Sequence, residues 1–143
     1  MLDRVTEELE AARFAIVQTM RAVEADAVWT RLAEHARVDR GGLDRCRINL
    51  EATFLLRLFA EFEGVLRHYW QHGLRRRTEP NVSVLIARVA SARGMPASHR
   101  RGADQVREYR NDLVHEQRLG VQLTFARCRS HIGRFLSWLP AEW

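Results

Sequence analysis

The residues best suited to catalysis lie in the stretch Arg107 to Glu116, which reads REYRNDLVHE. On a helix, Arg107, Asn111 and His115 recur every four residues and share one face. An imidazole can take a proton from a ribose 2′-hydroxyl or give one to a leaving oxygen. A guanidinium can hold phosphate oxygens as negative charge builds on them. These residue types fit RNA cleavage without a metal, although a lone histidine on a helix is more often structural.

Arg110 stands within the apolar stripe of the same predicted helix, beside Val106, Tyr109 and Leu113. Burying a guanidinium without partners is costly, so Arg110 needs a carboxylate, a phosphate or another subunit's surface. Arg110 and His115 are also five residues apart, which is about 140° around an ideal helix. One regular helix aims both at one point only if the arginine bends around or the helix end distorts. Two copies facing each other would let one protomer's arginine approach the other's histidine.

The helical period dominates the chain, and no convincing alternating strand is present. The first predicted helix starts at Leu2. A kink or a second short helix follows it up to about Val38, and Gly41-Gly42 is predicted to end this helical region. Four more helices are predicted: from Asp44 or Asn49 to Gln71, from Pro80 to Gly94, from a Ser98 cap to about Glu116, and from a Thr124 cap to Pro140. We therefore expect an all-α, mostly antiparallel bundle of about five helices, in one domain of residues 1–143.

The charge of the chain is concentrated in its middle third. The 143 residues carry a net charge of +5, and all 23 basic residues are arginines. Residues 67–110 alone hold ten arginines and three acidic residues, a net charge of +7. This block fits a polyanion-binding surface, with a solvated arginine-rich face as the alternative. The candidates for contact with an RNA backbone are Arg75, Arg76, Arg77, Arg100 and Arg101, together with Arg107 beside the catalytic candidates.

Two further groups have more than one interpretation. Glu61 and Glu63, on the predicted central helix, either support Arg110 and its site or form surface ion pairs with arginines four residues away. His68 and His72 have a spacing that zinc sites use. No glutamate follows the first histidine, and no third ligand is apparent nearby, so we predict neither a metal nor a cofactor.

The sequence predicts a soluble cytoplasmic protein without a membrane partner. The acidic N-terminus lacks an uninterrupted apolar run, and no stretch approaches 18 uninterrupted apolar residues. Cys46 and Cys128 are far apart and outside any metal-binding spacing, so both are expected to be reduced thiols. Cys128 falls on the apolar stripe of the last helix and is expected to be buried.

The stretch Arg110 to His115 resembles the signature of the HEPN superfamily, which has an arginine, a following polar residue and a later histidine. Two other segments resemble small HEPN proteins of the RiboL-PSP-like type. They are Leu50 to Glu63 on the central helix and the C-terminal stretch Arg134 to Trp143. The resemblance covers most of the chain from about residue 49 onward.

The resemblance implies a helical bundle that dimerises, with two motif helices meeting at a composite cleft. Many members are metal-independent endoribonucleases of toxin–antitoxin, abortive-infection or other defence systems. It assigns His115 as general acid or base, Arg110 as the group that stabilises the transition state, and Asn111 as a polar helper. The products would be a 2′,3′-cyclic phosphate and a 5′-hydroxyl. The implied partners are RNA, a second copy of the chain and possibly an antitoxin protein.

One position departs from the pattern, and other functions stay open. Some HEPN toxins carry a tyrosine two residues after the histidine, which a partner enzyme modifies with nucleotide; here that position is Gln117. Other HEPN domains are inactive, so the alternative function is a binding module for nucleotide, RNA or a partner protein. A DNA-binding regulator is a third possibility, which no clear helix-turn-helix pattern supports.

Overall fold

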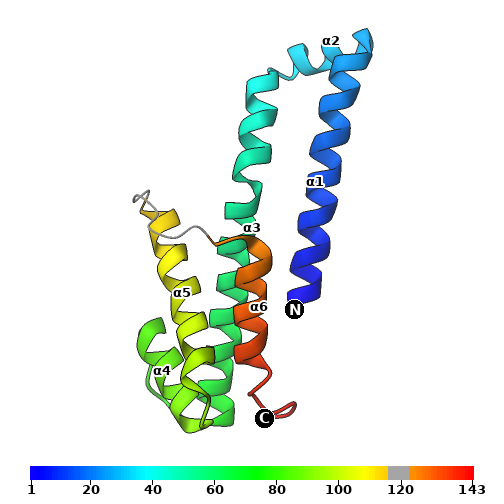
Figure 1. Ribbon diagram of the computed structural model, residues 1–143. Coiled ribbons are helices and arrows are strands. Elements are labelled where there is room, and N and C mark those ends of the chain that lie inside the picture. Colours follow the sequence, from blue (N-terminus) through cyan, green and yellow to red (C-terminus); the bar gives the residue numbers. More distant parts are fainter. Residues whose placement is uncertain (116–122) are drawn as a thin grey trace. The chain divides into compact units, whose positions relative to one another are not determined.

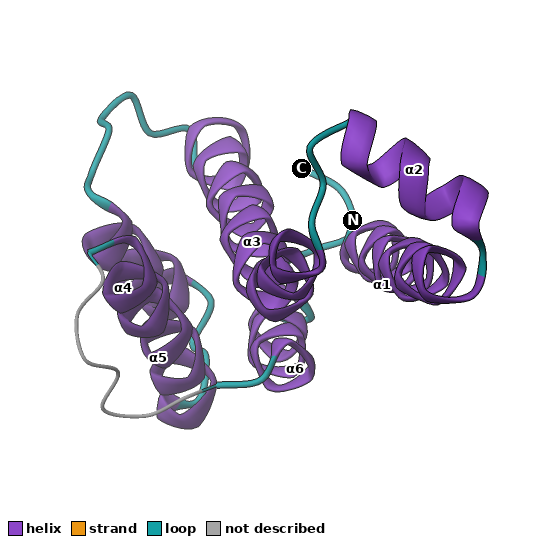
Figure 2. Ribbon diagram, turned by 90° about the horizontal axis from the view of Figure 1, so that it is seen from above, coloured by secondary structure: helices purple, strands orange, loops and turns teal. Residues whose placement is uncertain are grey.

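The computed structural model describes residues 1–115 and 123–143, and within these ranges the chain is helical with no strand. Figure 1 shows the helices, and Figure 2 shows them from above. They are α1 (Leu2–Ala25), α2 (Ala27–His35), α3 (Arg40–His68), α4 (Val82–Ala92), α5 (Ala97–Val114) and α6 (Phe125–Leu136), with a π-helical turn η1 (Tyr69–Gly73) after α3. The all-α prediction is confirmed, but these ranges hold six α-helices instead of about five. The expected helix end near Glu116, and Gln117, lie outside them.

The start of α3 corrects the prediction that Gly41-Gly42 ends a helix. Both glycines lie in the first turn of α3, which begins at Arg40. The carboxylate of Asp39 accepts a hydrogen bond of 2.5 Å from the Gly42 N–H, as helix-capping side chains do. A side chain at Gly42 would place its Cβ 2.9 Å from this carboxylate oxygen. The glycine therefore leaves room for the Asp39 cap and marks the start of a helix, not its end.

The later helix starts show which capping predictions hold. Thr124 caps α6 as predicted, because its hydroxyl accepts a backbone N–H three residues on. The start of α4 lies after Pro80, and Asn81 is the cap. Ser98 lies inside α5, whose N-cap position is Pro96 without a side-chain hydrogen bond. In both wrong cases the chosen residue lies one or two positions from the true cap.

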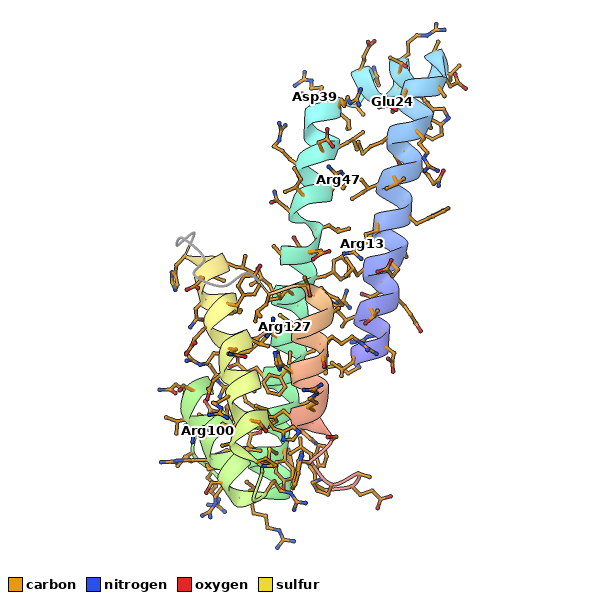
Figure 3. All side chains as sticks on the ribbon, in the orientation of Figure 1. Arg13, Glu24, Asp39, Arg47, Arg100 and Arg127 are labelled. Carbon is orange, nitrogen blue, oxygen red and sulfur yellow. The ribbon has the colours of Figure 1, made fainter. Side chains whose placement is uncertain are left out.

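By its internal contacts the chain divides into two compact units, Asp3–Phe54 and Leu55–Trp143. The first holds α1, α2 and the N-terminal half of α3. Figure 3 shows Arg13 of α1, which pairs with Glu51 of α3 and with Glu10. This unit leaves several large apolar side chains exposed: Phe14, Val28, Trp29, Leu32, Val38 and Ile48. A single domain over residues 1–143 stays a prediction.

The second unit is built around the apolar face of the C-terminal half of α3. Phe59 and Phe62 are buried and meet edge to face at 5.8 Å, and Phe62 meets Phe135 of α6 in the same way at 5.5 Å. The rest of this core comes from all four helices of the unit: Leu55, Leu58, Leu66, Leu85, Ile86, Val89, Ala103, Val106, Phe125, Cys128 and Ile132. The apolar face of α3 thus contacts more than one neighbouring helix. In the described ranges, no helix is both long and apolar enough to cross a lipid bilayer.

Helices α5 and α6 pack closely at Gly102. A Cβ at this position would lie 2.6 Å from Nδ1 of His131 on α6. The His131 Nε2 atom is buried and has no hydrogen-bond partner in the described structure. Burial, followed by the charges of Arg127 and Arg134, lowers the pKa of His131. A neutral imidazole therefore fits this interface best.

Gly102→Ala should destabilise the fold by about 1–3 kcal/mol, because the added methyl overpacks the α5–α6 contact. Gly64→Ala is the matched control. A Cβ at Gly64 meets nothing within 4 Å, so the exchange should stabilise α3 by up to about 1 kcal/mol. Urea unfolding measures both. Equal effects of the two substitutions would contradict the close packing at Gly102.

The lowered pKa of His131 also predicts a pH dependence of stability. The unfolded state takes up a proton at the ordinary pKa of about 6.5, before the folded state does. The free energy of unfolding should therefore decrease as pH falls below about 6.5. His131→Gln should flatten this dependence relative to the wild type. Unfolding curves measured between neutral and mildly acidic pH test this, and an unchanged slope in His131→Gln would refute it.

Candidate functional site

Helix α5 positions the catalytic candidates along its C-terminal half. Gly102, Ala103 and Val106 are its buried residues and anchor it to the core. The helix ends at Val114, so His115 is the first residue beyond it, with φ −95° and ψ 7°. The His115 N–H still donates a hydrogen bond of 3.0 Å to the Asn111 carbonyl. The imidazole is thus exposed at the end of a helix whose backbone is held up to that residue.

Arg110 is half-buried and is held by an aromatic ring and an amide. Its guanidinium carbon lies 5.9 Å from the centre of the Phe59 ring, within the range of a cation–π contact. Its Nη1 donates a hydrogen bond of 3.1 Å to Oδ1 of Asn111. No carboxylate of the described residues contacts it. A guanidinium has five N–H donors, and Asn111 accepts from one of its nitrogens, so most of the donors stay free for a ligand or water.

Arg107 is placed differently, although it lies one turn away on the same helix. Its guanidinium lies 3.7 Å from Asp104 and 3.2 Å from Glu108. Asp104 also pairs with Arg100 at 3.5 Å; Figure 3 labels Arg100 on the first turns of α5. Acidic residues of α5 therefore offset the charges of both arginines. Of the substrate-binding candidates on this helix, only Arg101 is exposed without a carboxylate partner among the described residues.

Glu63 forms an ion pair with Arg67, which was one of the two roles predicted for it. Its carboxylate accepts hydrogen bonds of 2.6 and 3.0 Å from Arg67, which also donates to the Pro80 carbonyl. Glu61 lines a separate hollow of about 590 Å³ on α3, together with Arg57, Ala60, Gly64, Val65, His68 and Trp143. Glu63 therefore pairs with Arg67, whereas Arg110 contacts Phe59 and Asn111.

His68 and His72 lie close together at the end of α3 and in η1. Their ring centres are 4.4 Å apart, and Trp143 lies beside His68 at 6.3 Å. Within the described ranges, no three histidine, cysteine or acidic side chains are grouped so that they could hold a metal ion. The ring contacts fit an aromatic cluster that joins the C-terminus to the end of α3.

The arginine loop lies apart from the Arg110–His115 motif. Arg75, Arg76 and Arg77 follow η1 and line a hollow with Arg88 of α4. Helix α5 starts at the end of the unit where α4 finishes and ends at the other (Figure 1). Since 18 helical residues span about 27 Å, the hollow and His115 lie roughly one helix length apart. The structure therefore divides the substrate-binding candidates between two places.

Sequence reasoning missed two residues that matter to these places. Phe59 is one of many apolar residues of the central helix, and nothing in its spacing showed that Arg110 would lie over its ring. Arg88 was not singled out, because it is one exposed arginine on a short helix. Both gain their importance from a contact between helices, which the spacing along one helix does not reveal.

Cys128 is excluded as a nucleophile. Burial raises the pKa of its thiol to about 12, so the reactive thiolate is scarce at neutral pH. Cys46 is exposed on α3, and both cysteines are free, as expected.

One thiol of the native protein should react with Ellman's reagent, and two should react after unfolding in guanidinium. The native reaction reports Cys46, because Cys128 is shielded and protonated. The matched variant Cys46→Ser should show no native reaction. Rapid native labelling of that variant would contradict the buried position of Cys128.

Comparison with known proteins adds no assignment to this geometry. Neither a protein-family model nor a curated protein nor a solved structure matches the chain.

Proposed function

We propose that this protein is a metal-independent endoribonuclease of HEPN type in which Arg110 and His115 act on the same phosphate. The proposal rests mainly on the surroundings of the Arg110 guanidinium. Its guanidinium is half-buried and oriented by Phe59 and Asn111, yet no described carboxylate offsets its charge. Arg107 on the same helix is offset by two carboxylates. An oriented cation without a counter-charge is suited to an anion that arrives with the substrate.

The chemistry needs only groups that these residues supply. The imidazole of His115 takes the proton from a ribose 2′-hydroxyl, and the 2′-oxygen attacks the adjacent phosphorus. The bond from phosphorus to the 5′-oxygen breaks, and that oxygen takes up a proton from an imidazolium or from water. Arg110 binds the non-bridging oxygens while negative charge builds on them. The products are a 2′,3′-cyclic phosphate and a 5′-hydroxyl.

A pair of chains would complete this site. Arg110 lies on the regular part of α5 and His115 directly after its end, about 140° further around the helix. Pairing two copies about a two-fold axis brings the arginine of one α5 toward the histidine of the other. Val114, next to His115, is 47% exposed and offers apolar area for such a contact. The proposed active form is therefore a homodimer, which sedimentation at micromolar concentration would detect.

The resemblance gives the proposal its biological setting. A nuclease of this type would be a toxin or a defence effector that acts on cellular or phage RNA, and an antitoxin protein would restrain it. An inactive HEPN module that binds nucleotide, RNA or a partner protein is the alternative. The two functions differ in whether RNA is cut.

His115→Ala should lower the rate of RNA cleavage by at least about 100-fold, the usual contribution of general acid–base catalysis. Arg110→Ala should lower the rate by about 100- to 1000-fold, because the non-bridging phosphate oxygens lose the donor that stabilises their negative charge. Cleavage of structured and single-stranded RNA in excess EDTA measures both. The exposed His35 and Arg134 provide matched alanine controls that should retain wild-type rates.

The chemical ends of the RNA fragments, and cleavage in the presence of EDTA, distinguish the proposed nuclease from an inactive protein. Cyclic phosphate ends formed by the wild type in EDTA, and lost in both variants, support the proposal. Intact RNA with all proteins, or equal cutting by all of them, would overturn it. Wild-type binding of RNA without cutting would favour the inactive module.

A further inference from the structure

A concave, basic pocket lies where η1 and the loop that follows it meet the C-terminal half of α4. Its volume is about 650 Å³, and its lining includes the guanidinium-bearing residues Arg75, Arg76, Arg77 and Arg88. The other lining residues are Trp70, Leu74, Thr78, Ser91 and Ala92. Among the described residues that line the pocket, none is acidic. Four positive charges thus share one hollow in which only hydroxyl groups and apolar surface accompany them.

The loop that carries three of these arginines is folded back onto η1. The indole N–H of Trp70 donates a hydrogen bond of 2.8 Å to the Thr78 carbonyl. The Arg76 N–H donates one of 3.0 Å to the Trp70 carbonyl, and Arg75 has a φ of 50°, in the left-handed region. A non-glycine residue is held there only when its surroundings fix it. The pocket wall is therefore organised before any ligand arrives.

The four arginines lack the counter-charges that other arginines of this chain have. Arg107 and Arg67 lie against glutamates or aspartates. In contrast, no described carboxylate pairs with Arg75, Arg76, Arg77 or Arg88. Like charges gathered in one hollow repel each other, so the arrangement gains most from an anionic ligand. Guanidinium groups favour phosphate in particular, because their donors match its oxygens in pairs.

The aromatic residue of the pocket is not available to stack a base. Trp70 is 6% exposed, its indole N–H is used by Thr78, and the Arg88 guanidinium covers its ring at 5.9 Å. Recognition is therefore of phosphate and not of the base. Four guanidinium charges also exceed the two negative charges of a single phosphate group, which favours a ligand that carries several phosphates along a chain.

We infer that this pocket is a second RNA-binding site, which holds backbone phosphates of a single-stranded segment at a distance from the cleavage site. The choice of RNA as the polyanion rests on the proposed function. A strand bound by Arg110 and His115 near the C-terminal end of α5 would extend to Arg75–Arg77 and Arg88 near the other end of this helix, which is itself about 27 Å long. The pocket adds affinity for the strand without reading its sequence, and it takes no part in the chemistry.

A triple variant, Arg75→Gln, Arg76→Gln and Arg77→Gln, tests the inference. The control variant carries Arg21→Gln, Arg31→Gln and Arg134→Gln, which removes the same charge from exposed positions outside the pocket. Binding of a fluorescein-labelled single-stranded RNA is followed by anisotropy, with His115→Ala added to keep the RNA intact. The pocket variant should bind at least about tenfold more weakly than the control, and its dependence of log K on log salt should be shallower by about 2.

Competitors and kinetics separate the remaining possibilities. Unlabelled single-stranded DNA should displace the RNA, because it carries the same phosphodiesters, whereas a nucleoside triphosphate and polyglutamate should displace it poorly. In proteins that retain His115, the pocket variant should raise KM and leave kcat unchanged. Arg88→Gln alone should weaken binding in the same direction.

The inference would be overturned if the pocket and control variants bound RNA with equal affinity. It would also be overturned if polyglutamate displaced the RNA as well as single-stranded DNA of matched charge does. A third contrary result would be a wild-type protein that binds the triphosphate tightly in this pocket while the pocket variant binds RNA as well as the control does. Far-ultraviolet circular dichroism confirms that the variants are folded. Failure of the proposed nuclease is a separate outcome. In that case RNA binding still depends on Arg75–Arg77, but neither His115→Ala nor Arg110→Ala changes the integrity of the RNA.

Discussion

The contact between Arg110 and Phe59 joins the candidate site to the core, and the proposed chemistry depends on it. Phe59 is fixed by its edge-to-face contact with Phe62, which in turn meets Phe135 of α6. A helix-borne cation is thus oriented by a row of aromatic rings that also packs α3 against α6. The ring offers its negative face but no formal charge, so it places the guanidinium without neutralising it. A carboxylate partner would instead offset the charge of the guanidinium, as Asp104 and Glu108 do for Arg107.

The arginines of this chain fall into two classes by their surroundings. Some lie against carboxylates and stabilise helices or link them, as Arg13, Arg67 and Arg107 do. Others lack such a partner among the described residues, above all Arg110 and the loop Arg75–Arg77. A net charge of +5 does not distinguish these classes. Arg110 lies one turn before the helix end that the exposed His115 follows, and Arg75–Arg77 line a pocket without acidic residues. Both places fit a phosphate chain.

Helical periodicity was enough to predict the all-α fold, the burial of Cys128 and the Thr124 cap of α6. These features depend on residues near each other in sequence, where spacing determines which face is buried. The Gly41-Gly42 prediction was wrong because Asp39 caps the turn that contains the glycines. Two other features depend on contacts between separate segments and were not predicted. They are the cation–π contact of Arg110 with Phe59 and the position of Arg88 beside the arginine loop. The π-helical turn at Tyr69–Gly73 likewise has no simple spacing signal.

The central claim is that Arg110 and His115 act on one phosphate across a pair of chains. Mixing two inactive variants, Arg110→Ala and His115→Ala, after brief unfolding and refolding together, tests it most directly. Half of the randomly formed dimers would be mixed, and each would carry one intact arginine–histidine pair, so about a quarter of the wild-type cleavage rate should return. A mixture as inactive as its separate components, beside an active wild type refolded in the same way, would contradict the shared site.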